Sequence, residues 1–287
     1  MLTPHAKKPS PKPLVIGITG ASGCILGFRF MAELLALDIP VELVMTEKSR
    51  QVIFEEMNLK VTGDAEDQAL GILRHLHLSE DHTHQLKIYG NNDLGAPPSS
   101  GTHLTRGMAV IPCSMGTLGR IAGGITDTLA ARAADVTLKE QRKLVVVPRE
   151  SPLNKIHLRN MTTLADCGAV LIPPMLSLDL PDFGTIEGQI NYTIGKVMDQ
   201  FGIEHDLYTR WAWESRLRWI ELDEQLVPFC PTRDGDRLRP VLLGMTIAVR
   251  VAVPVPVIVP VIVIARRNGQ AQGEHETDLP MADAHGF

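Results

Sequence analysis

The segment from Leu14 to Leu37, LVIGITGASGCILGFRFMAELLAL, constrains the fold more than any other part of the chain. An apolar strand runs into a tight glycine-rich turn, and an amphipathic helix follows. That order places the backbone N–H groups of residues 20–23 at a helix N-terminus, where unpaired amides and the helix dipole attract anions. The hydroxyl of Ser22 adds a polar group to the turn. We therefore expect a phosphorylated cofactor near residue 20; the alternative is a turn that only permits close packing.

The glycine spacing limits which cofactor this turn can bind. Glycines at positions 17, 20, 23 and 27 do not form the G-x-G-x-x-G pattern of dinucleotide sites, and no Lys-Ser/Thr pair follows them as in ATP-binding P-loops. The second apolar run ends in Thr46, where an NAD enzyme usually offers a carboxylate to the ribose. Glu47 stands next to it, so an NAD site stays open as an alternative.

Apolar runs alternate with helical stretches through the first part of the chain. The strand-like runs are Leu14–Thr19, Val41–Met45, Met108–Ile111, Leu144–Val147 and Ala169–Ile172. This alternation predicts an α/β fold, a three-layer Rossmann-like (flavodoxin-like) parallel sheet with helices on both faces. Three runs meet a proline, at positions 112, 148 and 173, which we expect to end each strand. Ligands bind outside the carboxyl ends of such strands, so residues 113–117, 149–150 and 174–179 are candidate binding loops.

A polar segment over about residues 63–107 separates the second and third runs. Its latter part, GNNDLGAPPSSG at Gly90–Gly101, has the composition of a loop, and an ordered long loop is usually functional. Four histidines precede that loop, at positions 75, 77, 82 and 84. No carboxylate or cysteine completes a recognisable ligand set with them, so we predict a solvated helix or loop and no metal.

Composition and charge narrow the class of protein. The formal net charge of −5 gives no electrostatic reason to expect nucleic acid. The four cysteines show no C-x-x-C spacing, which is typical of reduced thiols in an intracellular, cytoplasmic protein.

Cations gather on the helix expected over Asp127–Lys139, where Arg132 and Lys139 share a face; alone, this indicates a solvated surface. The apolar stretch Val241–Ala265 could span a bilayer, but Arg250 and three prolines disfavour a membrane helix.

A series of motifs resembles, in order, the UbiX-like flavin prenyltransferases, within the wider group of flavin-containing cysteine decarboxylase folds. The motifs are GITGASG at Gly17–Gly23, GNNDLGAPPSSG at Gly90–Gly101, PCSMGTLGRIAGG at Pro112–Gly124, ARAADVTLKEQRKLVVVPRESPLNKIHLRNM at Ala131–Met161 and GAVLIPP at Gly168–Pro174. The likeness runs from about Leu14 to about Trp211. We therefore expect a flexible arm over residues 1–13, a flavin prenyltransferase-like domain over 14–213 and an irregular or disordered extension over 214–287.

The resemblance implies an enzyme that joins a dimethylallyl group to N5 and C6 of reduced FMN without a metal. The donor it implies is dimethylallyl phosphate, as the monophosphate or the diphosphate. The product, prenylated FMN, is expected to pass to a UbiD-type decarboxylase, and the chain is expected to form a homo-oligomer, a dodecamer. Two alternatives stay open on the same fold, an FMN-dependent oxidative cysteine decarboxylase and a non-catalytic FMN-binding protein.

The resemblance also implies roles for individual residues. The FMN contacts it implies are Gly20, Ala21, Ser22, Thr46, Ser114, Met115, Gly116, Thr117 and Arg149. Glu150 is implied as the acid–base residue, and Ser22 and Glu56 as residues that orient flavin N5. The implied donor site comprises Ser100, Arg132, Lys139, Asp179, Lys196 and Trp211, the last flanking the prenyl pocket. Three positions depart from the family: Asp179 replaces a tyrosine, Lys196 a frequent arginine, and Leu94 a frequent aromatic residue.

Overall fold

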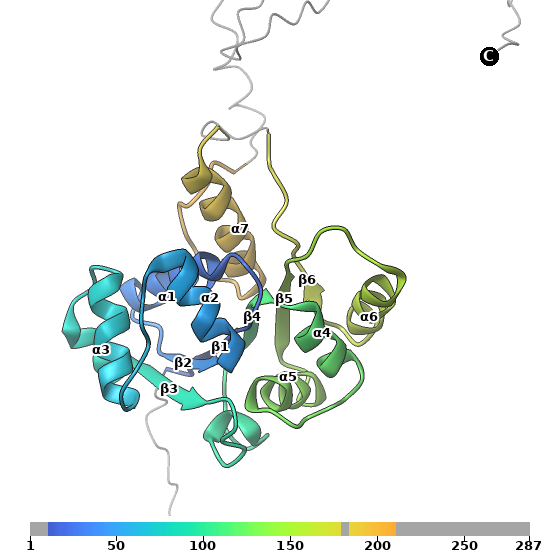
Figure 1. Ribbon diagram of the computed structural model, residues 1–287, viewed down its shortest axis with the longest axis horizontal. Helices are drawn as coiled ribbons and strands as arrows, with labels where there is room; N and C mark the ends of the chain where they lie inside the picture. The colour runs from blue at the N-terminus through green and yellow to red at the C-terminus, as the bar shows by residue number, and fades with distance from the viewer. Residues whose placement is uncertain (1–10, 179–183, 211–287) are drawn as a thin grey trace, which may run out of the picture. The chain divides into compact units, whose positions relative to one another are not determined.

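The structure is a computed structural model that describes residues 11–178 and 184–210 (Figure 1). Three parts of the chain lie outside the described residues: residues 1–10, residues 179–183 with Asp179, and residues 211–287 with Trp211 and the apolar stretch 241–265. At the described end of the arm, the carbonyl of Pro13 accepts a hydrogen bond of 2.8 Å from the Arg106 N–H. The domain limits therefore stay a prediction.

The described residues form one parallel sheet of six strands in the order β3-β2-β1-β4-β5-β6. The strands are β1 (Leu14–Ile18), β2 (Val41–Met45), β3 (Leu86–Gly90), β4 (Gly107–Cys113), β5 (Lys143–Pro148) and β6 (Val170–Leu171). In register, Ile16 of β1 pairs with Leu43 of β2 on one side and with Ala109 of β4 on the other. The strand order reverses between β1 and β4, and such a switch point is where open α/β sheets bind ligands.

Helices cover both faces of this sheet (Figure 1), which confirms the predicted fold class. One face carries α1 (Cys24–Ala36), α2 (Glu47–Met57), α3 (Ala65–His75) and α7 (Ile186–Gln200), which share a hydrophobic cluster. The other carries α4 (Met115–Ala122), α5 (Leu129–Lys139) and α6 (Lys155–Asp166), which share a second cluster. Two short 3₁₀ turns, η1 (Glu80–Gln85) and η2 (Pro97–Ser99), lie between β3 and its neighbours in the chain.

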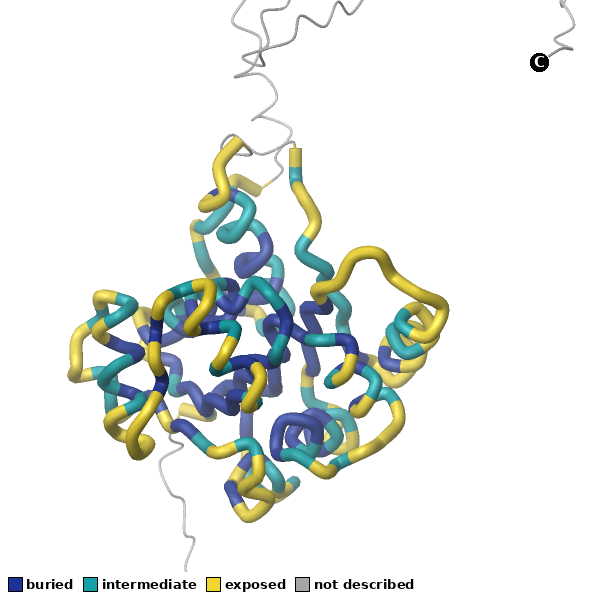
Figure 2. The backbone as a smooth tube through the Cα atoms, viewed as in Figure 1, coloured by how far each residue is buried: buried dark blue, intermediate teal, exposed yellow. Residues whose placement is uncertain are grey.

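Both faces of the sheet are apolar because successive side chains of each buried strand point to opposite faces and nearly all of them are apolar. In β1, Ile16 and Ile18 point into the first cluster and Val15 into the second, as side chains alternate along a strand. All five residues of β1 are buried, and so are all five of β2. Figure 2 shows the buried sheet at the centre and exposed residues over the outer turns. The site residues therefore come from the strand ends, where polar side chains leave this core.

The polar segment 63–107 holds more structure than its composition predicts. It contains α3, η1, η2 and the edge strand β3. The strand β3 is the element that the sequence did not predict. In β3 only Leu86 and Ile88 are fully buried, while Lys87 and Gly90 are exposed, because an edge strand faces water on one side. Two apolar residues give a signal too short to separate a strand from a loop.

Two predicted boundaries are wrong. Pro112 does not end its strand, because β4 continues to Cys113 with an irregularity in its pairing with β5 after Val110. The helix expected over Asp127–Lys139 begins two residues later, at Leu129, because Thr128 is the N-cap of α5, and the Asp127 carboxylate forms an ion pair of 3.1 Å with Arg120. Pro148 is the last residue of its strand, as expected.

Two further predictions concern membranes and metals. Among the described residues, no helix combines the length and apolar character needed to cross a bilayer. In the same part of the chain, no group of three or more histidine, cysteine or acidic side chains is arranged to hold a metal ion. The histidines in question are dispersed, with His75 closing α3 and His82 and His84 in η1.

Candidate functional site

The turn between β1 and α1 is built for a close backbone approach. Gly23 adopts a left-handed conformation with φ 95°, which glycine accepts without strain, and α1 begins at the next residue. A Cβ added to Gly20 would lie 2.6 Å from Cβ of Lys48, so α2 packs directly against the turn. The Ala21 N–H donates to the Thr19 carbonyl at 2.8 Å. The Gly20 and Ser22 amides have no protein acceptor among the hydrogen bonds of the described residues.

The N-terminus of α1 is occupied by the carboxylate of Glu56 from α2. Both oxygens of Glu56 accept a hydrogen bond of 3.0 Å from the Gly23 N–H, and one also accepts from the Cys24 N–H at 3.0 Å. An anion at this end of a helix is stabilised by the dipole. The sequence predicts a phosphate near this turn, but Glu56 takes the helix end itself, and the amides of residues 20 and 22 remain for a ligand. Glu56 is thereby bonded to the residue that follows Ser22, and the role of both residues toward flavin N5 stays a prediction.

Burial and the Glu56 charge also affect the neighbouring thiol. Both raise the pKa of Cys24 to about 12, burial being the larger cause. The thiol is therefore protonated at neutral pH and does not act as a nucleophile.

A second turn, at the carboxyl end of β4, lies beside the first. The Ser114 N–H donates to Oγ1 of Thr19 at 2.7 Å, and that hydroxyl donates to the Pro112 carbonyl at 3.0 Å. Ser114 caps α4, since its hydroxyl accepts a hydrogen bond from the Thr117 N–H at 3.3 Å. Gly116, in the first turn of α4, has open space where a Cβ would stand. The predicted loop 114–117 thus forms a helix N-terminus next to residues 20–22.

Two more predicted positions complete this edge of the sheet. The Arg149 N–H donates to the Cys113 carbonyl at 3.1 Å, which places residues 149 and 150 beside the β4 turn. The side chains of Arg149 and Glu150 are exposed, and Glu150 accepts only a local bond of 3.0 Å from the Ser151 N–H among the described residues. Thr46 follows β2, donates from its N–H to the Ile18 carbonyl at 3.0 Å and caps α2 with its hydroxyl.

We call these positions the carboxyl-edge cluster. Its members lie around the switch point between β1 and β4 and are Gly20, Ala21, Ser22, Thr46, Glu56, Ser114, Met115, Gly116, Thr117, Arg149 and Glu150.

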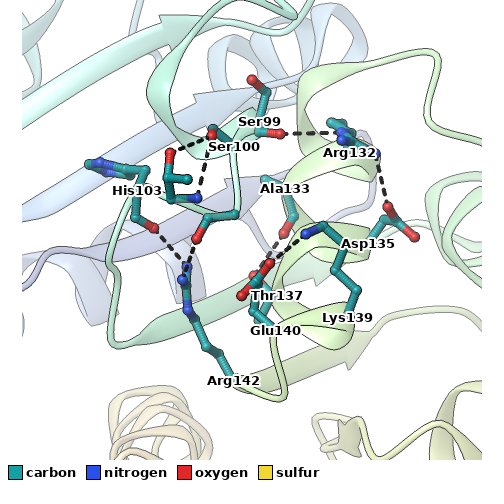
Figure 3. Close-up of polar contacts among 12 residues, drawn as sticks. Ser99, Ser100, His103, Arg132, Ala133, Asp135, Thr137, Lys139, Glu140 and Arg142 are labelled. Atoms are coloured by element: carbon teal, nitrogen blue, oxygen red, sulfur yellow. Dashed lines mark hydrogen bonds and ion pairs between the residues drawn. The ribbon is translucent and has the colours of Figure 1, made fainter.

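A different group of predicted residues gathers along α5 (Figure 3). Arg132 donates from Nε to the Ser99 carbonyl at 3.2 Å and pairs with Asp135 at 3.1 Å. Lys139 pairs with Glu140 at 2.5 Å, and this contact lowers the pKa of Glu140. A Cβ added to Gly101 would lie 2.7 Å from Nζ of Lys139, so the loop after Ser100 touches this ammonium.

We call Ser100, Arg132 and Lys139 the α5 cluster. Its Lys139 end is tied to the opposite edge of the sheet from the carboxyl-edge cluster, whereas Arg132 lies one turn after the start of α5, where the Leu129 N–H donates to the Asn91 carbonyl at 2.7 Å directly after β3. Arg142, which holds the Gly101 carbonyl, directly precedes β5, whereas Arg149 directly follows it. A strand of six residues is roughly 17–20 Å long. One chain therefore does not bring Lys139 to the flavin turns.

Lys196 lies on α7 and belongs to neither cluster. Its ammonium is 3.8 Å from Oδ2 of Asp199 and 5.8 Å from the centroid of the Tyr208 ring. Asp199 also binds Arg210 at 2.8 Å, and hydrogen bonds from Arg210 and Tyr208 outweigh burial and lower its pKa. The other two predicted donor residues, Asp179 and Trp211, lie outside the described residues.

The chain matches known proteins over this whole region. Residues 2–200 match the family model described as Flavoprotein. A flavin prenyltransferase UbiX from Alkalihalophilus pseudofirmus is 46% identical over 202 residues, which cover 70% of this chain and 96% of that protein. The chain belongs to the UbiX-like flavin prenyltransferases. The membership predicted from the motifs is thus confirmed, and with it the class of enzyme, a transferase.

Two solved structures of similar sequence also resemble this chain in fold. AnUbiX (PadA1), crystallised in complex with FMN and dimethylallyl pyrophosphate, has a TM-score of 0.62 and 34% identity, and the match covers 71% of this chain and 98% of that one. A dodecameric FMN-dependent UbiX-like decarboxylase from Escherichia coli O157:H7 has a TM-score of 0.60 and 37% identity, with 70% and 99% coverage.

Sequence reasoning missed three features of this flavin prenyltransferase. Thr19 joins the turns after β1 and β4 through its hydroxyl, although its place directly after an apolar run was a signal. Asn91 bonds the first amides of α5 from a distant loop, because its carbonyl accepts from the Leu129 N–H at 2.7 Å and its side chain from the Ala130 N–H at 3.1 Å. A pocket of about 410 Å³ opens at the carboxyl ends of β2 and β3, lined by Met45, Glu47, Arg50 and residues 90–93. Its lining joins the start of the motif at Gly90–Gly101 to residues that follow β2, 45 positions earlier in the chain, and no single motif shows that the two meet.

Proposed function

We propose that this chain transfers a dimethylallyl group from dimethylallyl phosphate to N5 and C6 of reduced FMN. The product, prenylated FMN, is then passed in the cytoplasm to a UbiD-type decarboxylase. One observation carries the proposal. The three turns that the family resemblance assigns to FMN, at residues 20–22, 114–117 and 149, meet at the switch point of the sheet in a chain that is 46% identical to a flavin prenyltransferase.

The residues present fit the phosphate of FMN. The Gly20 and Ser22 amides lack a protein acceptor among the described hydrogen bonds, and Arg149 is exposed at the same edge of the sheet. Backbone amides and arginine are the donors that bind phosphate most often. Gly116 leaves space at the start of α4. Ser114 and Thr117 hydroxyls supply further polar contacts at the same edge.

The reaction needs proton transfers that this chain can supply. The C–O bond of the donor breaks, flavin N5 forms a bond to the released carbon and loses its proton, and phosphate leaves. The prenyl double bond is then protonated, and C6 forms the second bond to carbon and loses its own proton. Glu150 is exposed at the switch point and is assigned the proton transfers to and from these groups. Glu56 holds the turn that carries Ser22 in place beside flavin N5.

The separation of Lys139 from the carboxyl-edge cluster supports a site shared between subunits. Since Lys139 and the carboxyl-edge cluster lie at different edges of one chain, we infer that the α5 cluster binds the donor phosphate at the flavin of a neighbouring subunit. A dodecameric relative from Escherichia coli is consistent with such an assembly. Light scattering after gel filtration tests it, because a monomer would contradict a shared site.

The test of the reaction uses purified protein, chemically reduced FMN and dimethylallyl monophosphate or diphosphate under anaerobic conditions. We expect mass spectrometry of the extracted flavin to show a species heavier by one prenyl unit. The matched control is Glu150→Gln, which keeps the size of the side chain and removes its proton transfer. Unchanged FMN with the wild-type protein and both donors contradicts the proposal.

Asp179 favours one second candidate, a non-catalytic FMN-binding protein, because a carboxylate stands where relatives carry a tyrosine. A carboxylate repels a phosphate, so an Asp179→Tyr variant separates the two functions. If only this variant makes prenylated flavin while the wild type binds FMN, the chain is an FMN-binding protein.

A further inference from the structure

The loop that carries Ser100 is fastened at two points by residues outside the predicted site. We propose that Arg142 and the pair formed by buried Glu42 and half-buried His103 are positioning residues, which hold Ser100 at the donor-phosphate cations Arg132 and Lys139. The inference deepens the proposed function and rests on it for the identity of the donor. We call residues 99–103 the donor loop.

Arg142 forms the first fastening. Its two terminal nitrogens donate to the Gly101 and His103 carbonyls, each at 2.7 Å (Figure 3). A guanidinium can hold two carbonyls at once because its donors form a rigid planar fork, which an ammonium cannot reproduce. The Arg142 N–H also donates to the Thr137 carbonyl at 2.9 Å. The donor loop is therefore attached to the end of the helix that carries Arg132 and Lys139.

The second fastening is the contact between His103 of the donor loop and Glu42 of β2. Glu42 of β2 is only 3% exposed, and both of its oxygens are 2.9 Å from Nε2 of His103. The Tyr89 hydroxyl of β3 donates to the same carboxylate at 3.4 Å. A buried carboxylate that lost its partner would be strongly destabilised, so Glu42 holds His103 and the loop with it. Glu42 is the polar residue of β2, whose sequence VELVM is otherwise apolar.

The donor loop then meets the two cations at close range. Arg132 donates to the Ser99 carbonyl at 3.2 Å, and Gly101 packs against the Lys139–Glu140 pair. A Cβ at position 101 would lie 2.2 Å from Oε1 of Glu140, so the loop has no room to move toward α5. Release of Arg142 therefore lets the loop move only away from the cations. Ser100 would then leave the phosphate position, while the carboxyl-edge cluster stays as it is.

The test measures the affinity for dimethylallyl monophosphate by calorimetry on protein loaded with oxidised FMN, which cannot be alkylated. We expect Arg142→Ala to weaken this binding about tenfold, with Arg142→Lys between it and the wild type. The affinity for FMN should stay within about twofold, because the flavin turns lie at the other edge. Arg106→Ala is the matched control, since Arg106 is exposed and its side chain forms no hydrogen bond or ion pair with the described residues. In turnover with reduced FMN, KM for the donor should rise and kcat should stay nearly constant.

A second variant keeps the inference testable if Arg142→Ala does not fold. Glu42→Gln/His103→Ala removes the buried pair without leaving a bare carboxylate, and we expect the same loss of donor affinity. Equal donor affinities of the Arg142 and Arg106 variants, or a parallel loss of FMN affinity, would overturn the inference while leaving the proposed function intact. Donor binding without product in the wild type would instead refute the proposed function, and the variant affinities would still decide the role of Arg142. A wild-type protein that binds no donor overturns both.

Discussion

The contact between Glu56 and the start of α1 is the most informative target for mutation. Glu56→Ala removes three hydrogen-bond contacts of 3.0 Å at the Gly23 and Cys24 amides. Loss of a side-chain cap costs about 0.5–2 kcal/mol, and loss of a negative charge at a helix N-terminus costs roughly 0.3–1 kcal/mol more. We expect the variant to be less stable by about 2 kcal/mol, which corresponds to a fall in Tm of roughly 4–8 °C for a chain of this size.

Thermal unfolding of the flavin-free protein followed by circular dichroism measures this effect. Glu55→Ala is the matched control, because Glu55 lies on the same helix and contacts only Gln51, at 2.9 Å, among the described residues. Glu56→Gln keeps an acceptor but loses the charge, so its stability should lie between those of the wild type and Glu56→Ala. The thiol of Cys24 should also become more reactive toward iodoacetamide in Glu56→Ala, since the Glu56 charge contributes to its raised pKa. Equal melting temperatures for the two alanine variants would refute the capping role of Glu56.

Three further predictions follow from the same contacts. Gly20→Ala should weaken FMN binding about tenfold or more in a fluorescence titration, because its Cβ would lie 2.6 Å from Cβ of Lys48 and force the turn to move; unchanged affinity would show that the turn does not bind the flavin. Glu150→Gln should lower kcat about 100-fold with FMN affinity unchanged, as expected for loss of a general acid–base group; full activity would remove Glu150 from the mechanism. The pKa of Asp199 is lowered in the folded protein, so its contribution to stability is present above the unfolded pKa and is lost as the pH falls through the folded value. Asp199→Asn should therefore flatten the acid limb of the stability curve below about pH 4, as measured by urea unfolding, and an unchanged limb would contradict this.

The fold could be predicted from sequence wherever periodicity was strong. The strand–turn–helix of residues 14–37 and the buried run of β2 each carry enough apolar residues to fix their type. The edge strand β3 could not be predicted, because only Leu86 and Ile88 are buried and polar residues surround them. The strand end at Pro112 was misplaced because β4 tolerates the proline at an irregularity of its pairing.

The site was predictable as a set of turns but not as a set of contacts. Positions that follow strands, such as Ser114 and Arg149, meet at one edge because parallel strands all end there. The hydrogen bond between the Gly23 amide and Glu56 joins residues 33 positions apart, and α2 offers two other carboxylates, Glu47 and Glu55. The two fastenings of the donor loop likewise join distant residues, with 61 positions between Glu42 and His103. Such partners are set by packing of the finished fold.

The central claim is that the turns at the β1–β4 switch point bind FMN, while the α5 cluster of another subunit supplies the donor site. A crystal structure of the assembled protein with FMN and dimethylallyl monophosphate tests it most directly. We predict the FMN phosphate at the Gly20 and Ser22 amides and the donor phosphate at Arg132 and Lys139 of the adjacent subunit. FMN bound away from residues 20–22 and 114–117, or a donor phosphate with no contact to any Arg132, would contradict the account.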